Sequence, residues 1–190
     1  MIKILLLNII CILQIFLCSA ASGQDLINGN FEQGQNAGWQ PYNNYDRNVL
    51  IMGNRLFQPY SGRWFVSLVA REYGEVSRLS QQITLPNIRA VYLNLFIFLY
   101  SEEMCDVPYY DAIVISINQI PLIENPRICS GNPPVRGWIP STFDLSMFAG
   151  QTVLITFQVS TIDTGSTVFS LDNISIDSKP LSWPPDNWRR

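Results

Sequence analysis

The chain is a succession of short β-prone segments separated by turn residues, and this pattern limits its fold more than any other feature. After Gln24, Gly, Pro, Asn and Asp interrupt the chain repeatedly, and no long stretch has helical periodicity. We therefore expect an all-β protein, an antiparallel two-layered sandwich. The expected strands are Val49–Met52, Trp64–Val69, Arg78–Leu85, Val91–Tyr100, Ala112–Ile120, Arg136–Phe143, Thr152–Ser160 and Val168–Ile176.

Alternation within the segments indicates which strands have one face in the core. Apolar and polar residues alternate through Thr152–Ser160, as in a strand with one buried face. Val91–Tyr100 is almost continuously apolar, which predicts a strand covered on both faces. The one helical expectation is a single turn over Asp144–Phe148, capped by Asp144.

The first 23 residues have the composition of a secretory signal peptide. Lys3 precedes the apolar stretch Ile4–Leu17, and small residues follow it up to Gly23. The alternative, a membrane anchor, needs about 20 apolar residues, and no later segment could span a bilayer. We expect a signal peptide over 1–23, a sandwich domain over 24–178 and a Pro/Trp-rich tail over 179–190, in a secreted protein.

Two cysteines remain once the signal peptide is removed. Cys105 and Cys129 would then lie in an oxidising compartment, which favours a disulfide over two free thiols. Closing this loop would stabilise the fold by roughly 3.5 kcal/mol in the chain-entropy model.

Composition excludes several classes of function. The chain has no histidine, which removes His-paired nucleophiles, His-ligated zinc and the usual proton shuttle near neutral pH. A net charge of −3 is not the electrostatic footprint of a nucleic-acid-binding protein. Paired carboxylates are the remaining catalytic set, and adjacent Glu102 and Glu103 are typical of a solvated turn, so we expect no enzyme.

Three segments together resemble the calcium-binding jelly-roll modules of the galactose-binding-like type, which include carbohydrate-binding modules and the related MAM adhesion domains. The segments are LINGNFEQG at 26–34 with Gly38-Trp39, PYSGRWFVSL at 59–68, and the closing strands FDLSMFAGQTVLITFQVS at 143–160 and VFSLDNISID at 168–177. The resemblance covers nearly the whole mature chain. It implies an antiparallel jelly-roll β-sandwich.

The resemblance also implies a structural calcium ion between the first and last strands. The matching ligands are the carboxylates of Glu32 and Asp172 and the backbone carbonyls at Asn30, near Arg63 and at Asp172. Calcium prefers six to eight oxygen ligands of this kind. Asn173 stands where these modules often have a second Asp, and the alternative is that Glu32 caps backbone amides and Asp172 makes a turn.

A carbohydrate site combines exposed aromatic rings with polar partners, and two loops have this mixture. The candidate stacking residues are Tyr42, Tyr45, Tyr109 and Tyr110, and the candidate polar partners are Asn44, Asp106 and Arg127. For any single aromatic side chain, packing within its own loop is the alternative. The sequence thus predicts a secreted, non-catalytic carbohydrate-binding module; the alternative is an extracellular adhesion or assembly module with a protein partner.

Overall fold

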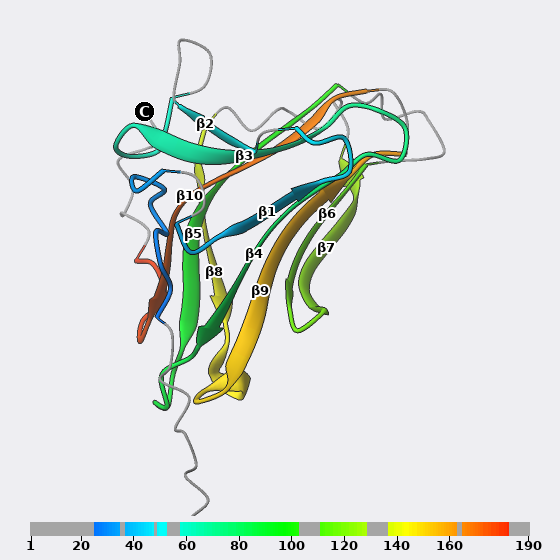
Figure 1. The fold of residues 1–190 in the computed structure, drawn as a ribbon. Helices are drawn as coiled ribbons and strands as arrows, with labels where there is room; N and C mark the ends of the chain where they lie inside the picture. Colours follow the sequence, from blue (N-terminus) through cyan, green and yellow to red (C-terminus); the bar gives the residue numbers. More distant parts are fainter. Residues whose placement is uncertain are drawn as a thin grey trace, which may run out of the picture.

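The computed structural model describes residues 25–34, 37–47, 49–52, 58–102, 111–128, 137–162 and 165–182, which form a sandwich of two antiparallel sheets (Figure 1). The first sheet has the strand order β1-β4-β9-β6-β7, and the second β2-β3-β10-β5-β8. The strands are β1 Gln40–Asn43, β2 Leu50–Met52, β3 Trp64–Ala70, β4 Val76–Thr84, β5 Tyr92–Ser101, β6 Asp111–Ile117, β7 Ile120–Ile128, β8 Ile139–Asp144, β9 Thr152–Ser160 and β10 Thr167–Asp177. The expected all-β jelly-roll sandwich is confirmed.

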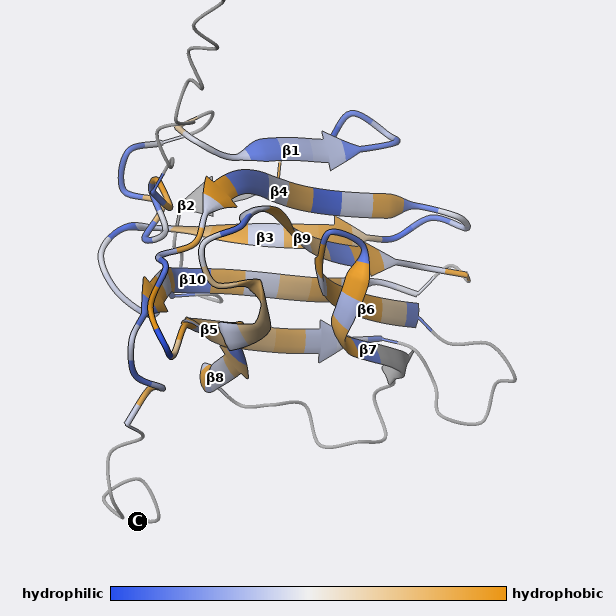
Figure 2. Ribbon diagram, turned by 90° about the horizontal axis from the view of Figure 1, so that it is seen from below, coloured by the Kyte–Doolittle hydropathy of each residue, from blue (hydrophilic) through white to orange (hydrophobic). Residues whose placement is uncertain are grey.

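The core lies between the two sheets because alternate side chains of each strand point inward. Figure 2 shows hydrophilic and hydrophobic residues following one another along β4. In β9 the inward side chains are all apolar and buried, and they face apolar side chains of β3, β5 and β10 across the sandwich. The buried residues of β9 are Val153, Ile155, Phe157 and Val159, and those opposite include Leu68, Leu95, Phe169 and Leu171. Removing this surface from water stabilises the fold by roughly 25 cal/mol per Å².

The expected strands correspond to observed strands with shifts of one to three residues at most of their ends, and one of them is two strands. Ala112–Ile120 was expected to be a single strand, but β6 ends at Ile117 and β7 begins at Ile120. Asn118 (φ 50°) and Gln119 (φ 69°) form the connection between them. Two central residues with positive φ are typical of a type I′ turn, which joins antiparallel strands tightly.

The second face of β5 is covered by a connecting segment and by the end of the domain. The ring of Tyr60 stacks on Phe96 with centroids 3.4 Å apart. Asn94 donates from Nδ2 to the carbonyl of Lys179, and its Oδ1 accepts the N–H of Leu181 at 3.1 Å. The described start of the tail is therefore fastened across β5, which explains why this strand is apolar on both faces.

The expected helical turn is present but shorter than predicted, and its N-cap is Leu145 rather than Asp144. One 3-10 turn, Ser146–Phe148, follows β8, and Asp144 accepts the N–H of Ser146 at 2.8 Å. Trp39 is buried, and Trp138 packs edge-on against Phe65. Within the part of the chain that the structure describes, no helix is long and apolar enough to cross a membrane.

Candidate functional site

A row of side chains crosses the outer face of the first sheet. Cross-strand pairing places Tyr42 opposite Arg78, Arg78 opposite Gln158, Gln158 opposite Val114, and Val114 opposite Glu124. We call these five residues the outer row. All five strands contribute to it, and adjacent strands are about 4.8 Å apart, so the row is about 19 Å long. A second row beside it is polar and small, and consists of Gln40, Ser80, Thr156 and Ser116.

Tyr42 and Arg78 form the aromatic end of the outer row. The Tyr42 ring is 49% exposed, and the guanidinium carbon of Arg78 lies 4.9 Å from the centroid of that ring. A cation at this distance is attracted to the π-face and limits the motion of both side chains. The pair therefore presents a positioned, half-exposed ring next to a cation.

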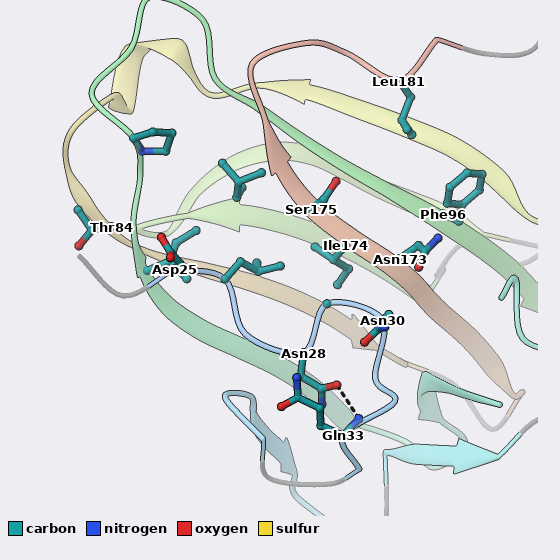
Figure 3. A pocket seen from close by; sticks show the side chains of 15 residues that line it. Asp25, Asn28, Asn30, Gln33, Thr84, Phe96, Asn173, Ile174, Ser175 and Leu181 are labelled. Atoms are coloured by element: carbon teal, nitrogen blue, oxygen red, sulfur yellow. Dashed lines mark hydrogen bonds between the residues drawn. The ribbon is translucent and has the colours of Figure 1, made fainter. Parts of the chain in front are cut away.

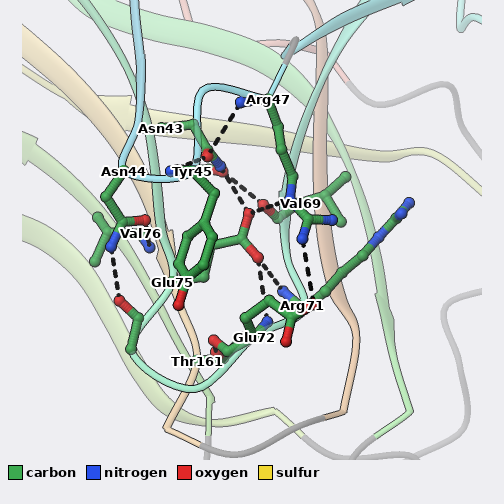
Figure 4. Close-up of polar contacts among 12 residues, drawn as sticks. Asn43, Asn44, Tyr45, Arg47, Val69, Arg71, Glu72, Glu75, Val76 and Thr161 are labelled. Atoms are coloured by element: carbon green, nitrogen blue, oxygen red, sulfur yellow. Dashed lines mark hydrogen bonds and ion pairs between the residues drawn. The ribbon is translucent and has the colours of Figure 1, made fainter.

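The loops at this end of the sheet are held by a buried carboxylate, Glu75 (Figure 4). Its Oε1 accepts from Asn43 Nδ2 at 2.8 Å and lies 3.2 Å from Arg47 Nε, while its Oε2 accepts the N–H groups of Arg71 and Glu72. One carboxylate thus joins the end of β1, the loop after it and the β3–β4 turn. Because these loops are held in place before a ligand binds, less conformational entropy would be lost on binding.

The predicted ligand residues Asn44 and Tyr45 lie in the loop that Glu75 holds. Asn44 donates to the carbonyl of Gly74 at 2.9 Å and accepts the N–H of Val76 at 2.8 Å, so its amide connects two loops. Tyr45 is half-exposed, and its hydroxyl lies 3.4 Å from the carbonyl of Tyr73. Tyr73 is 75% exposed, and sequence reasoning did not select it.

Several predicted residues cannot be placed at the site. Asp106, Tyr109, Tyr110, Cys105 and Cys129 lie outside the described residues. For Arg127, only the backbone is described, as part of β7. The disulfide and the second tyrosine loop therefore stay predictions.

Sequence reasoning missed Arg78 and Gln158, although a signal for both was present. They occupy polar positions in the strands expected over 78–85 and 152–160, and the alternation alone assigns them to the outward face. What the sequence did not contain is the order of the strands in the sheet. That order places Arg78 between Tyr42 and Gln158.

Two of the predicted metal ligands, the carboxylates of Glu32 and Asp172, lie at a separate place, around the segment 60–64. The carbonyls predicted at Asn30, near Arg63 and at Asp172 stay predictions. Glu32 Oε1 accepts the N–H of Arg63 at 2.7 Å and that of Trp64 at 2.8 Å. Asp172 Oδ2 accepts the N–H of Ser61 at 3.0 Å. The two carboxylates, 140 residues apart in the sequence, thus contact the same short segment.

The pKa of Asp172 is raised to about 6, mainly by burial and to a smaller extent by the negative charge of Glu32. Hydrogen bonds from the backbone of Ser61, Asn173 and Tyr60 oppose the increase. The side chain is fully buried, so the raised pKa does not make it an acid within reach of a substrate. Two like charges near one another disfavour the ionised form of each, and a cation bound between them would remove this effect.

The donor set fits calcium better than a softer metal. The described residues contain no group of three His, Cys, Asp or Glu side chains that could hold a metal, so backbone carbonyls and amide oxygens would have to complete the shell. Calcium accepts such ligands, whereas structural zinc sites are built from cysteine and histidine side chains. Both hydrogen bonds to Glu32 use Oε1, and no bond to Oε2 occurs among the residues that the structure describes. The same bonds also agree with the alternative, in which Glu32 only caps backbone amides and Asp172 makes a turn.

A cavity of about 680 Å³ adjoins the metal candidate, between the N-terminal segment and β10 (Figure 3). Its wall combines the amides of Asn28, Asn30, Gln33 and Asn173 with apolar side chains such as Phe96 and Ile174. Asn28 Oδ1 accepts the N–H of Gln33 at 3.0 Å, which closes the turn at its rim. Among the described residues that line it, Asp25 carries the charged side chain.

No protein-family model and no curated protein matches the sequence, but solved structures match the fold. TmCBM61, a carbohydrate-binding module solved in complex with beta-1,4-galactotriose, matches with a TM-score of 0.58 at 15% identity, over 82% of this chain and 99% of that one. The K1 adhesin domain of Lys-gingipain from Porphyromonas gingivalis W83 matches with a TM-score of 0.52 at 16% identity, over 83% and 99%. This chain has the jelly-roll sandwich fold of these domains. At these identities the likeness is one of fold, so any ligand of this jelly roll has to be inferred from its own surface.

Proposed function

We propose that this jelly roll binds carbohydrate noncovalently on the outer face of its first sheet. The observation that carries the proposal is the outer row, in which a half-exposed tyrosine ring is positioned next to Arg78 and Gln158 on a rigid sheet. A sugar ring has an apolar C–H face and a rim of hydroxyl groups. Tyr42 suits the first, and guanidinium, amide and hydroxyl groups suit the second. The galactotriose complex of TmCBM61, a protein of the same fold, supports this proposal.

The proposed function has no catalytic step. The outer row holds a single carboxylate, Glu124, whereas glycoside hydrolysis requires two acidic groups on opposite sides of the scissile bond. The acid with a strongly raised pKa, Asp172, is buried on another part of the molecule. Secretion accords with this function, since extracellular glycans are the expected ligands. No observation on the described surface favours the protein-partner alternative.

The test is binding of residues 24–190 to a broad glycan panel, followed by the variant Tyr42→Ala. Loss of a stacking ring is expected to weaken binding at least tenfold with an unchanged melting temperature. Tyr100→Ala is the matched control, because Tyr100 is a partly exposed tyrosine of β5 on the other sheet. A folded protein that binds no glycan, or equal affinity of both variants and wild type, would overturn the proposal.

We also propose that calcium bridges Glu32 and Asp172 and fastens the N-terminal segment to β10. Because calcium would bind only the folded state, it is expected to raise the melting temperature of the demetallated protein. Glu32→Gln is expected to remove this increase, and Glu124→Gln, which removes an exposed carboxylate far from the site, is expected to keep it. Identical melting curves of the wild type with and without millimolar calcium would exclude the site.

A further inference from the structure

Arg78 is an unmatched cation in the middle of the proposed sugar surface. None of its side-chain nitrogens has an acceptor among the residues that the structure describes, and its Nε is buried without a hydrogen-bond partner. Arg47, by contrast, pairs with Glu72 at 3.3 Å and with Glu75 at 3.2 Å. Burial closes Nε to a ligand, so an acceptor would have to bind the terminal guanidinium nitrogens of this partly exposed side chain, which are not among the buried atoms. These N–H groups have no protein acceptor among the described residues and are free to donate to a ligand.

We infer that the outer row recognises glycans that contain a uronic acid, with the sugar carboxylate bound by Arg78. This inference rests on the proposed function and names the class of its ligand. A guanidinium offers parallel N–H donors in one plane, which match the two oxygens of a carboxylate. The neighbouring groups on the face, Ser80 and Gln158, are neutral and suited to the hydroxyl groups of the same sugar.

The other charges on this face do not neutralise Arg78. Glu124 lies three strands away in the outer row, about 14 Å at the usual strand spacing. This separation exceeds the Debye length of about 8 Å at physiological salt. The net charge of −3 is spread over the whole chain and is screened in the same way, so the local cation decides the preference.

Stacking and charge would act on the same sugar unit. The Tyr42 ring and the Arg78 guanidinium are in contact, so a uronate placed with its carboxylate on Arg78 lies within reach of the exposed part of the ring. The ring also shields the guanidinium from water, which strengthens a charge-assisted hydrogen bond. The tyrosine would supply affinity for sugars in general, and the arginine would supply the preference for an acidic sugar.

The experiment compares oligogalacturonates and other oligouronates with their methyl esters, which keep the sugar and remove the charge. Wild type is expected to bind the acid at least tenfold more tightly than the ester. Arg78→Gln is expected to reduce this ratio to about one. Arg89→Gln removes the same charge from an exposed turn at the other end of β4 and is expected to keep the ratio.

The possible outcomes test the uronate inference and the proposed carbohydrate binding separately. An acid-to-ester ratio near one in wild type, or a ratio that persists in Arg78→Gln, would overturn the uronate inference. If neutral glycans bind through Tyr42 while no uronate is preferred, carbohydrate binding stands and the inference fails. If the folded protein binds neither neutral nor acidic glycans, the proposed function itself fails.

Discussion

At the scale of single residues, the buried carboxylate of Glu75 holds the loops beside the proposed binding surface in place. It satisfies two backbone N–H groups and the amide of Asn43 where water cannot replace it. Polar groups left without a partner after its removal would carry their full desolvation cost. The arrangement of Tyr42 and Tyr45 therefore depends on a residue that no ligand touches.

Glu75→Ala is expected to lower the free energy of unfolding by roughly 3 kcal/mol, because a buried charge and its hydrogen bonds are lost together. Glu72→Ala is the control: Glu72 pairs with the same Arg47 but is half-exposed, and its loss should cost about 0.5 kcal/mol. Urea unfolding measures both. Equal effects of the two substitutions would show that burial of Glu75 has no special role.

Gly62 allows Glu32 to reach the segment 60–64. Its φ is +64°, and a Cβ at this position would lie 2.3 Å from Glu32 Oε1. Gly62→Ala is expected to lower the free energy of unfolding by about 1–2 kcal/mol, because alanine is strained in the left-handed backbone conformation. The added methyl group is also expected to displace the carboxylate of Glu32, which lowers the stability further. Gly74 has a φ of +73°, and no atom lies within 4 Å of the methyl group that alanine would add. Gly74→Ala should therefore lower the free energy of unfolding only through the strained backbone. Chemical denaturation gives the free energy of unfolding of both variants, and the difference between their losses measures the effect of displacing Glu32. Equal losses would show that the contact between Gly62 and Glu32 does not matter for stability.

At the scale of elements, Asp144 connects β8 to the short 3-10 turn. Hydrogen bonds from the side chain and the backbone of Ser146 lower the pKa of Asp144, opposed by a small effect of burial. The folded state thus favours the ionised form. The stabilisation is present above the unfolded pKa of about 3.8 and is lost as the pH falls through the lower folded value.

Asp144→Asn keeps an acceptor oxygen but does not titrate. Wild type is expected to melt at a higher temperature than this variant at pH 7, and the difference should shrink as the pH is lowered below 4. Melting curves between pH 2 and 7 measure the effect. A difference that does not change with pH would show that the charge of Asp144 is not involved.

At the scale of the whole molecule, Trp39 attaches the N-terminal segment to the core. Its Nε1 donates to the carbonyl of Asn28 at 2.9 Å, and its ring packs between Phe31 and Phe157, with centroids 5.9 and 6.0 Å away. This contact brings the segment that contains Glu32 onto β9, independently of any metal. Two contacts therefore connect the N-terminal segment to the sheets: that of Trp39 with the core, and that of Glu32 with the segment 60–64.

Trp39→Ala is expected to cost 3–5 kcal/mol through the cavity it leaves, whereas Trp39→Phe, which mainly removes the hydrogen bond, should cost about 1 kcal/mol. Denaturation gives the free energies, and amide exchange of residues 26–34 shows whether the segment is released first. If both substitutions had the same cost, the hydrogen bond rather than the packing would dominate.

The sequence by itself determined the class of fold and most of the strands, because side-chain alternation is a local property. Thr152–Ser160 was predicted with both of its ends. A short helical turn was also found, but it covers only Ser146–Phe148 and its N-cap is Leu145, so the predicted cap at Asp144 was wrong. β1 was missed because Gln40–Asn43 is polar and contains a proline, features typical of an edge strand. β7 was missed for a related reason, since two prolines interrupt it at the other edge of the same sheet.

Tertiary structure alone decided which residues meet. Arg78 and Gln158 are 80 residues apart, and only the pairing of β4 with β9 makes them neighbours. Glu32, Asp172 and the chain near Arg63 were assigned to one site by resemblance to known modules, and the structure adds that N–H groups of this segment donate to both carboxylates. Local physics specifies which face of a strand a residue occupies, whereas the order of strands results from packing of the whole core. The proposed binding surface therefore depends on the order of the strands, which makes Tyr42, Arg78 and Gln158 neighbours.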